Sequence, residues 1–225
     1  MDDPVNVIIL LGPPGSGKGT QSDVLQRELN IPAISTGEVL RAEIAAGTPL
    51  GQKVKDTIGA GRLADDDLVN EVVAAQISQP AFARGFVLDG YPRTVNQARF
   101  LDGLLRRLGF PEPLVIHLEA DTETIFERLA ARRLCPCCHR IYNQILRPSK
   151  DGVHCDVDGT PLIIREDDKP AVIRDRLKAY RELSEPLIDF YRSRNYVSVD
   201  GNLPPETVFQ MLRPRFLEHM AQIKR

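Results

Sequence analysis

Five short apolar runs alternate along the chain with segments whose apolar residues recur at helical spacing. The runs are rich in β-branched residues and are apolar on both faces, as in strands buried inside a parallel sheet. They fall near residues 7, 33, 86, 114 and 197. Between them, residues such as Val24, Leu25 and Leu29 follow helical spacing. This alternation predicts an α/β fold with a five-stranded parallel sheet and helices on both faces.

Two segments depart from the alternation. At 37–66, small helical patterns follow one another without a strand, and Thr48 and Pro49 predict the cap and first residue of one helix. At 134–168, Pro, Gly and Asp are frequent and apolar periodicity is nearly lost. We therefore expect one domain over 1–225 with two insertions: a mobile flap over a ligand at 37–66, and a segment at 134–168 that cannot form a hydrophobic core of its own.

The first apolar run leads into a glycine-rich turn, and a helical pattern follows. The turn reads Gly12-Pro13-Pro14-Gly15-Ser16-Gly17-Lys18-Gly19-Thr20. A strand, such a turn and a helix N-terminus bring backbone N–H groups and the positive end of the helix dipole to one point, which favours an anion. The Lys18 side chain would reach the β- and γ-phosphates of a nucleotide, and glycines let the backbone approach closely. The sequence predicts a phosphate-chain site.

One departure from the general phosphate-loop pattern is informative. Gly19 stands where Ser or Thr usually follows G-x-x-x-x-G-K, and the hydroxyl comes one residue later at Thr20. The run G-x-P-G-x-G-K-G-T resembles that of nucleoside monophosphate kinases. This resemblance implies that magnesium is held mostly by phosphates and water.

A second motif begins where the third apolar run ends. Asp89 lies at the expected carboxyl edge of the sheet, where doubly wound sheets bind ligands, and a carboxylate there usually contacts magnesium through water. The residues Asp89-Gly90-Tyr91-Pro92-Arg93-Thr94, followed by Gln97, resemble the D-G-[FY]-P-R-T-x-x-Q signature of adenylate kinases. With both motifs in the expected order, the chain resembles adenylate kinases of the long form, which carry an inserted lid.

The resemblance covers nearly the whole chain and implies a reaction. A phosphoryl group would pass directly and reversibly from MgATP to AMP, giving two ADP, by in-line transfer. The flap at 37–66 would bind AMP and the segment at 134–168 would be the lid. Forked guanidinium groups and magnesium stabilise the negative charge on the phosphoryl group while it is transferred. Closure of both insertions would exclude water as a competing nucleophile.

The resemblance also implies roles for individual residues. The expected catalytic residues are Lys18, Arg93, Arg132, Arg165 and Arg176, which would act on phosphate charge, and Asp89, which would contact magnesium through water. The donor nucleotide is expected to contact Gly15, Ser16, Gly17, Lys18, Gly19, Thr20, Arg128, Arg132, Ile141, Tyr142 and Leu203. AMP is expected to contact Thr36, Arg41, Arg62, Leu63, Ala64, Gly90, Tyr91, Pro92, Arg93, Gln97, Arg165 and Arg176, with Gln97 at the adenine edge. For any single arginine, a surface salt bridge is the alternative.

All four cysteines fall in the segment at 134–168, which favours a metal site over a disulfide framework spread along the chain. The spacing Cys135-x-x-Cys138 followed by Cys155-x-x-Asp158 resembles the zinc-bearing lids of some bacterial adenylate kinases. The resemblance implies one structural zinc on these four residues. Cys137 is expected to be a free thiol. The alternatives are a disulfide or, as ligands, His139 and His154.

Charge and hydropathy limit the kinds of partner that the protein can have. Lys and Arg number 29 and Asp and Glu 31, so the net charge is −2 and no global basic field attracts nucleic acid or membranes. No apolar run approaches the ~20 residues that span a bilayer, and the acidic start, Asp2-Asp3, does not resemble a signal peptide. We expect a cytoplasmic monomer that binds ATP, AMP and ADP with magnesium, and neither nucleic acid nor membrane.

Two other functions stay open at this point. One is a kinase for another nucleoside monophosphate, or one that uses GTP as donor; kinases of pyrimidine monophosphates generally lack a long lid. The other is a nucleotide-regulated binding protein whose cysteine segment is a zinc ribbon on nucleic acid. A ribbon of that kind needs a basic face, whereas this segment carries Asp151, Asp156, Asp158, Glu166, Asp167 and Asp168.

Overall fold

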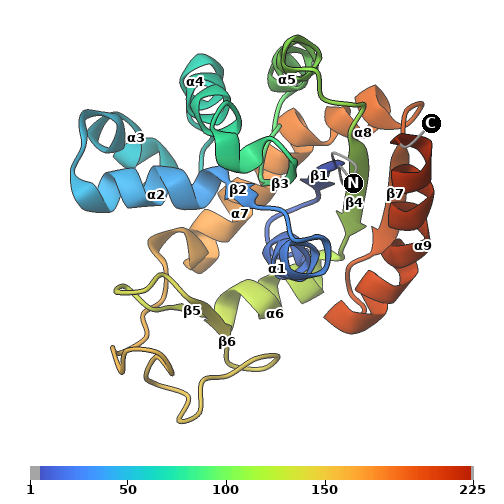
Figure 1. Ribbon diagram of the computed structural model, residues 1–225. Coiled ribbons are helices and arrows are strands. Elements are labelled where there is room, and N and C mark those ends of the chain that lie inside the picture. Colours follow the sequence, from blue (N-terminus) through green and yellow to red (C-terminus); the bar gives the residue numbers. More distant parts are fainter. Residues whose placement is uncertain (1–5, 224–225) are drawn as a thin grey trace.

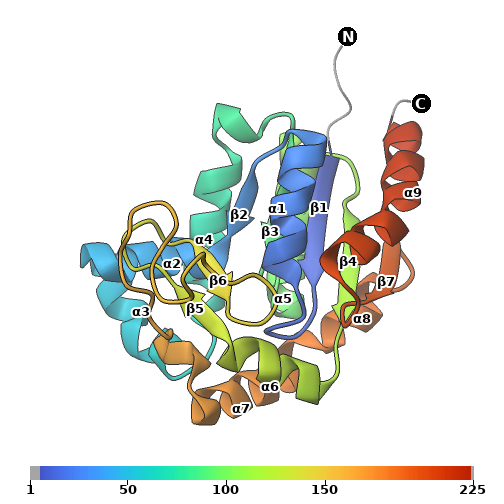
Figure 2. The same ribbon diagram turned by 90° about the horizontal axis from the view of Figure 1, so that it is seen from below.

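The computed structural model describes residues 6–223 and confirms the predicted parallel sheet. Five strands lie in the order β2-β3-β1-β4-β7, and every neighbouring pair is parallel. Figure 2 shows them side by side. Their bounds are β1 Asn6–Leu11, β2 Ala33–Ser35, β3 Gly85–Asp89, β4 Leu114–Glu119 and β7 Tyr196–Asp200. The strand order reverses direction beside β1, so ligands are expected at the carboxyl ends of the central strands.

Helices cover both faces of the sheet (Figure 1). One apolar core joins the sheet to α4, α5 and α8, and a second joins the opposite face to α1 and α9. The bounds are α1 Lys18–Leu29, α2 Thr36–Ala46, α3 Pro49–Gly59, α4 Asp66–Ile77, α5 Val95–Leu108, α6 Thr122–Ala130, α7 Pro170–Ala179, α8 Pro186–Tyr191 and α9 Pro205–Ile223. Short helical turns lie at Pro80–Phe82, Glu166–Asp168 and Tyr180–Ser184.

Local chemistry explains where several helices begin. The Thr48 hydroxyl accepts a hydrogen bond from the Gly51 N–H at the start of α3, and Pro49 is its first residue, as predicted. Asp65 caps α4 in the same way. Pro186 cannot donate to the preceding turn, and there the helical path changes to a widened turn before α8.

The segment after α6 stands apart from the two cores and makes a small sheet of its own. Strands β5, Arg132–Leu134, and β6, Ile141–Asn143, pair antiparallel. Figure 1 shows this region as loops projecting from the helix-covered sheet. Its buried apolar cluster holds only Cys135, Tyr142 and Cys155, with Leu162 packed against it. So small a cluster contributes little burial free energy, as the sequence predicts for this segment.

Candidate active site

The glycine-rich turn between β1 and α1 has the backbone that a phosphate loop requires. Gly12, Gly15 and Gly17 have φ of 139°, 83° and 101°, which L side chains rarely adopt. A Cβ at Gly12 would lie 2.4 Å from the Leu118 carbonyl oxygen, so only glycine lets the turn pass this close to β4. The turn ends at the N-terminus of α1, where the first helical N–H groups need an acceptor.

The Lys18 side chain folds back over this turn. Its ammonium donates hydrogen bonds of 2.8 Å to the carbonyl oxygens of Gly12 and Pro13. Burial lowers the pKa of Lys18 to about 7 against the raising effect of Asp89, and Arg93 is among the cations that lower it further. A phosphate at the turn would favour the charged form of this lysine.

Asp89 and the following turn connect the phosphate loop to a second site. A Cβ at Gly19 would lie 3.6 Å from Asp89 Oδ2, so this carboxylate at the end of β3 lies beside the loop. The Gly90 carbonyl oxygen then accepts 2.8 Å and 2.7 Å hydrogen bonds from the Thr36 hydroxyl and from Arg93 Nε. These hydrogen bonds connect the end of β3 to the start of α2 and to Arg93.

A pocket opens on the α2 side of this turn. It is lined by Thr36, Gly37, Leu40, Arg41, Ile58, Gly61, Arg62, Leu63, Ala64, Val69, Gly90, Arg93, Gln97, Asp167 and Arg176. It therefore has an apolar side from α2, α3 and α4 and a cationic side. An aromatic base on the first and a phosphate on the second would match this division.

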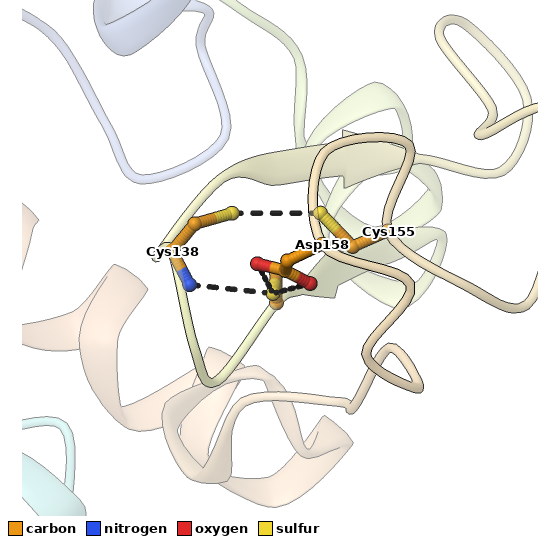
Figure 3. A group of neighbouring side chains, drawn as sticks. Cys138, Cys155 and Asp158 are labelled. Atoms are coloured by element: carbon orange, nitrogen blue, oxygen red, sulfur yellow. Dashed lines mark hydrogen bonds between the residues drawn. The ribbon is translucent and has the colours of Figure 1, made fainter.

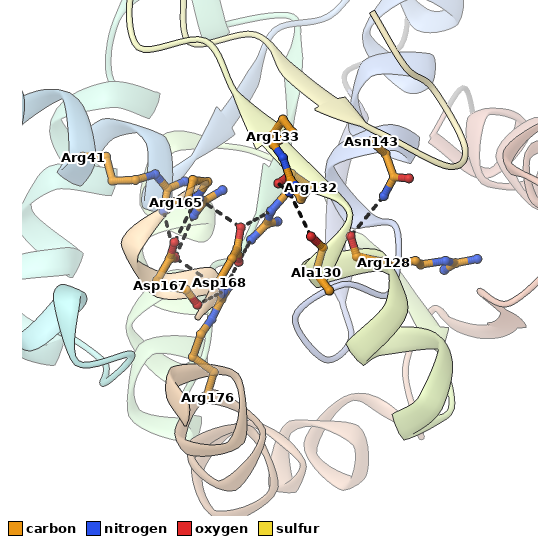
Figure 4. Close-up of polar contacts among 10 residues, drawn as sticks. All are labelled: Arg41, Arg128, Ala130, Arg132, Arg133, Asn143, Arg165, Asp167, Asp168 and Arg176. Carbon is orange, nitrogen blue, oxygen red and sulfur yellow. Dashed lines mark hydrogen bonds and ion pairs between the residues drawn. The ribbon is translucent and has the colours of Figure 1, made fainter. Parts of the chain in front are cut away.

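Arginines from four elements meet around two aspartates that follow the β5–β6 segment (Figure 4). Asp168 accepts from Arg132 Nε at 2.7 Å, pairs with a second Arg132 nitrogen, and accepts from Arg176 Nη1 at 2.9 Å. Asp167 accepts from Arg165 at 3.0 and 2.7 Å, and Arg41 Nη1 lies 3.8 Å from it. Two carboxylates thus hold four guanidinium groups.

Electrostatics agree with that geometry. Burial alone would raise the pKa of Asp167, but the charges of Arg165 and Arg176 outweigh it and hold the pKa well below its usual range. With four guanidinium groups against two carboxylates, the cluster keeps a net positive charge. This excess of positive charge can bind further anions without rearrangement of the side chains.

Four side chains in the segment at 134–168 form a compact group suited to a metal ion, and Figure 3 labels three of them, Cys138, Cys155 and Asp158. The ligand atoms of Cys135, Cys138, Cys155 and Asp158 all lie within 4.8 Å of one another. Cys138 Sγ is 3.4 Å from Cys155 Sγ, and Cys135 Sγ is 3.3 Å from Asp158 Oδ2. Three sulfurs and one carboxylate match the donors and the number of ligands of a structural zinc site.

The backbone has the same conformation after Cys135 and after Cys155, the first residue of each candidate ligand pair. The Cys135 N–H donates to the Arg140 carbonyl, and the Cys155 N–H donates to the Thr160 carbonyl, five residues ahead in both cases. His139 and Gly159, each four residues after a cysteine, have φ of 59° and 71°. Two matching turns therefore each present two of the four candidate ligands.

Comparison with known proteins gives the chain its relatives. The family model described as adenylate kinase matches residues 10–196. An adenylate kinase of Kosmotoga olearia is 46% identical over 202 residues, covering 89% of this chain and 94% of that protein. Adenylate kinases of Anaeromyxobacter sp. strain K and Thermosipho melanesiensis are 45% and 44% identical, over 92% and 90% of this chain and 97% and 95% of theirs.

The chain belongs to the adenylate kinase family. The predicted family and fold class are thereby confirmed, and the chain is a member of the nucleoside monophosphate kinases. Among residues 6–223 no helix is both long enough and apolar enough to cross a bilayer.

The structure brings most of the predicted site residues together. The phosphate loop with Lys18 and Asp89, the pocket residues, and the arginine cluster adjoin one another through Arg93 and Arg176. The pocket lining includes the predicted acceptor residues Thr36, Arg41, Arg62, Leu63, Ala64, Gly90, Arg93, Gln97 and Arg176. Tyr91 is fully buried nearby, and its hydroxyl donates to Asn70 Oδ1 at 2.5 Å.

The expected donor-base residues lie farther apart. Arg128 donates at 2.7 Å to the Gly201 carbonyl and at 3.1 Å to that of Asn202. Leu203 follows on the same loop and packs partly against the α1 and α9 core. Ile141 is exposed, whereas the Tyr142 hydroxyl points inward and lies 3.4 Å from Cys155 Sγ.

Sequence reasoning missed the roles of three acidic residues. Asp167 and Asp168 were counted only as acidic residues opposing nucleic-acid binding, yet they organise the arginines. Asp66 lies at the start of α4, where the helix dipole alone accounts for an acid, yet its carboxylate accepts hydrogen bonds from Gln97 and Thr94. An excess of arginines at element ends implies that partner acids exist, but local patterns do not say which.

Proposed function

We propose that this protein transfers a phosphoryl group directly and reversibly from MgATP to AMP, giving two ADP. The observation that carries the proposal is the presence of two neighbouring sites suited to anions, the phosphate loop and the pocket with an apolar and a cationic side, with a net positive arginine cluster beside both. Phosphoryl transfer requires mainly positioning and charge stabilisation, which such an arrangement supplies.

On the donor side, the backbone N–H groups from Gly15 to Thr20 would bind the ATP phosphates, with Lys18 at the β- and γ-phosphates. Arg128 would face the donor adenine, with Leu203, Ile141 and Tyr142 near it. Since Tyr142 is buried beside Cys155, its contribution would come from its backbone. Asp89 would hold magnesium through water, and the ion would supply positive charge against the ATP phosphates; the place of Asp89 beside Gly19 fits that role.

On the acceptor side, the apolar wall of the pocket would hold adenine. Gln97 would hydrogen-bond the base edge, while Arg41 and Arg93 would bind the AMP phosphate. Arg132, Arg165 and Arg176 would stabilise the phosphoryl group in flight from their positions on Asp167 and Asp168. Backbone around Arg62 to Ala64, Gly90 and Pro92 would complete the acceptor site.

The two insertions would close over the reacting groups. Residues 37–66 supply α2 and α3 to the pocket wall, and 134–168 joins the arginine cluster at its end. Closure of both would exclude water, which otherwise hydrolyses ATP. One zinc on Cys135, Cys138, Cys155 and Asp158 would stabilise the lid. Because all these groups come from one chain, we propose a monomer, working in the cytoplasm where ATP and AMP occur.

The proposed function is tested by acceptor choice. We expect rapid ADP formation from ATP plus AMP, little from ATP alone, and turnover of CMP, UMP and GMP at least about 10²-fold lower. A wrong base would leave the remaining N–H and lone pair of the buried Gln97 amide without a partner. A coupled assay for ADP measures each pair. Comparable rates with CMP would contradict the substrate assignment, and faster turnover with GTP than with ATP would favour the GTP-using alternative.

Donor binding should also depend on pH through Lys18. Its pKa of about 7 leaves the ammonium increasingly neutral at higher pH, so above pH 8 the affinity for ATP should fall by up to about tenfold per pH unit. The terminal phosphate of ATP, with a pKa of about 6, is already ionised in that range. Calorimetric titrations at pH 8 and pH 9 measure the slope, and in Lys18→Met it should disappear. An equal slope in both proteins would assign the pH dependence to another group.

A further inference from the structure

Asp66 contacts Gln97 rather than capping its own helix. It is the first residue of α4, and its Oδ1 accepts a 2.8 Å hydrogen bond from Gln97 Nε2. Its Oδ2 accepts a 2.7 Å hydrogen bond from the Thr94 hydroxyl. The capping of α4 is done by Asp65, whose carboxylate accepts from two backbone N–H groups of the first turn. Asp66 is therefore available for a role at the pocket.

The contacts of the Gln97 amide fix its orientation from both ends. Asp66 offers only acceptors, so the Nε2 end of the amide must face it. The Arg93 backbone N–H offers only a donor, and it bonds Gln97 Oε1 at 2.7 Å. A reversed amide would place oxygen against oxygen and N–H against N–H. In the observed orientation one Nε2 hydrogen and one Oε1 lone pair remain for a ligand in the pocket that Gln97 lines.

That orientation matters because a side-chain amide can pair with two kinds of base. With oxygen toward the 6-position it accepts from the amino group of adenine while its N–H donates to N1. Reversed, it donates to the 6-oxo group of guanine or hypoxanthine and accepts from their protonated N1. A glutamine free to rotate therefore discriminates poorly between 6-amino and 6-oxo purines. A glutamine with its orientation fixed accepts only one class.

We propose that Asp66 is a positioning residue that sets acceptor specificity for a 6-amino purine by fixing the Gln97 amide, a role that rests on the proposed AMP site. Asp66 does not touch the base. It makes reversal of the amide costly, because a hydrogen bond to a carboxylate is stronger than one to a neutral acceptor and would be replaced by repulsion.

The test compares AMP with IMP, which differs from it in carrying a 6-oxo group and a protonated N1. Asp66→Asn replaces a group that only accepts by one that can also donate, so the reversed amide finds a partner. The ratio of kcat/KM for AMP to that for IMP should fall by about tenfold, since a charged hydrogen bond is lost. The change should lie in the acceptor KM, and the KM for ATP should not move. Calorimetry with AMP and with IMP, without ATP, should show the same ratio in Kd.

The matched control is Asp67→Asn, which removes the same charge from the same first turn of α4 at an exposed position. It should leave the AMP to IMP ratio unchanged. Equal losses for AMP and IMP in Asp66→Asn would mean a merely structural role and would overturn the inference, while AMP turnover by the unaltered protein would still support the proposed function. Failure of the unaltered protein to use AMP would overturn both.

Discussion

Lys18→Met is expected to lower kcat/KM for the reaction of ATP with AMP by at least about 10²-fold, the loss typical of removing one preorganised donor at a developing charge. Methionine has a similar length but cannot donate to the β- and γ-phosphates. The fold should not suffer, because burial without phosphate lowers the pKa of Lys18 to about 7 and so disfavours its charged form. The melting temperature should stay the same or rise.

This combination separates a phosphate ligand from a structural lysine. The matched control is Lys178→Met, the same substitution on an exposed helical lysine whose nearest carboxylate is 4.0 Å away. It should leave both activity and melting temperature unchanged. Near-full turnover by Lys18→Met, measured by initial rates at saturating AMP, would contradict the place of the phosphate loop in the reaction.

The parts of the fold that the sequence predicted are those encoded over short distances. The β-branched runs form the five parallel strands, and Thr48 caps α3. Each of these depends on a few neighbouring residues and on general strand and cap chemistry.

The parts that it did not predict depend on pairing between distant residues. Asp168 and Arg132 are 36 positions apart, and Asp66 and Gln97 are 31 apart. Asp66 stands beside a genuine cap residue in a run of three acids, so a local explanation was already sufficient. Likewise, the burial of Tyr142 against Cys155 follows from the tight turns around the proposed zinc ligands rather than from its own surroundings in sequence.

Removal of zinc is expected to unfold the lid before the rest of the protein. The apolar cluster of this segment holds three buried residues, so the free energy of a four-ligand site would be a large part of what keeps it folded. Purified protein should contain one zinc per chain. A chelator should lower the melting temperature by about 10 °C, because a loss of a few kcal/mol shifts a domain of this size by that much. The Lys18 loop packs elsewhere and should still bind ATP.

Single substitutions identify the ligands. Asp158→Ala removes the only oxygen ligand of the group and should weaken zinc binding and lower the melting temperature in the same direction as chelation. Cys137→Ser is the matched control, since that exposed thiol lies between two of the proposed ligands but outside the group; it should change neither. His154→Ala should also keep the metal, because its ring pairs with Asp151 at 2.7 Å.

Two results would contradict the zinc site. If a reductant lowered the melting temperature and a chelator did not, the segment would be held by a disulfide between Cys138 and Cys155 instead of by zinc. Fully active protein that contains no metal and whose melting temperature is unchanged by chelation would rule the zinc site out.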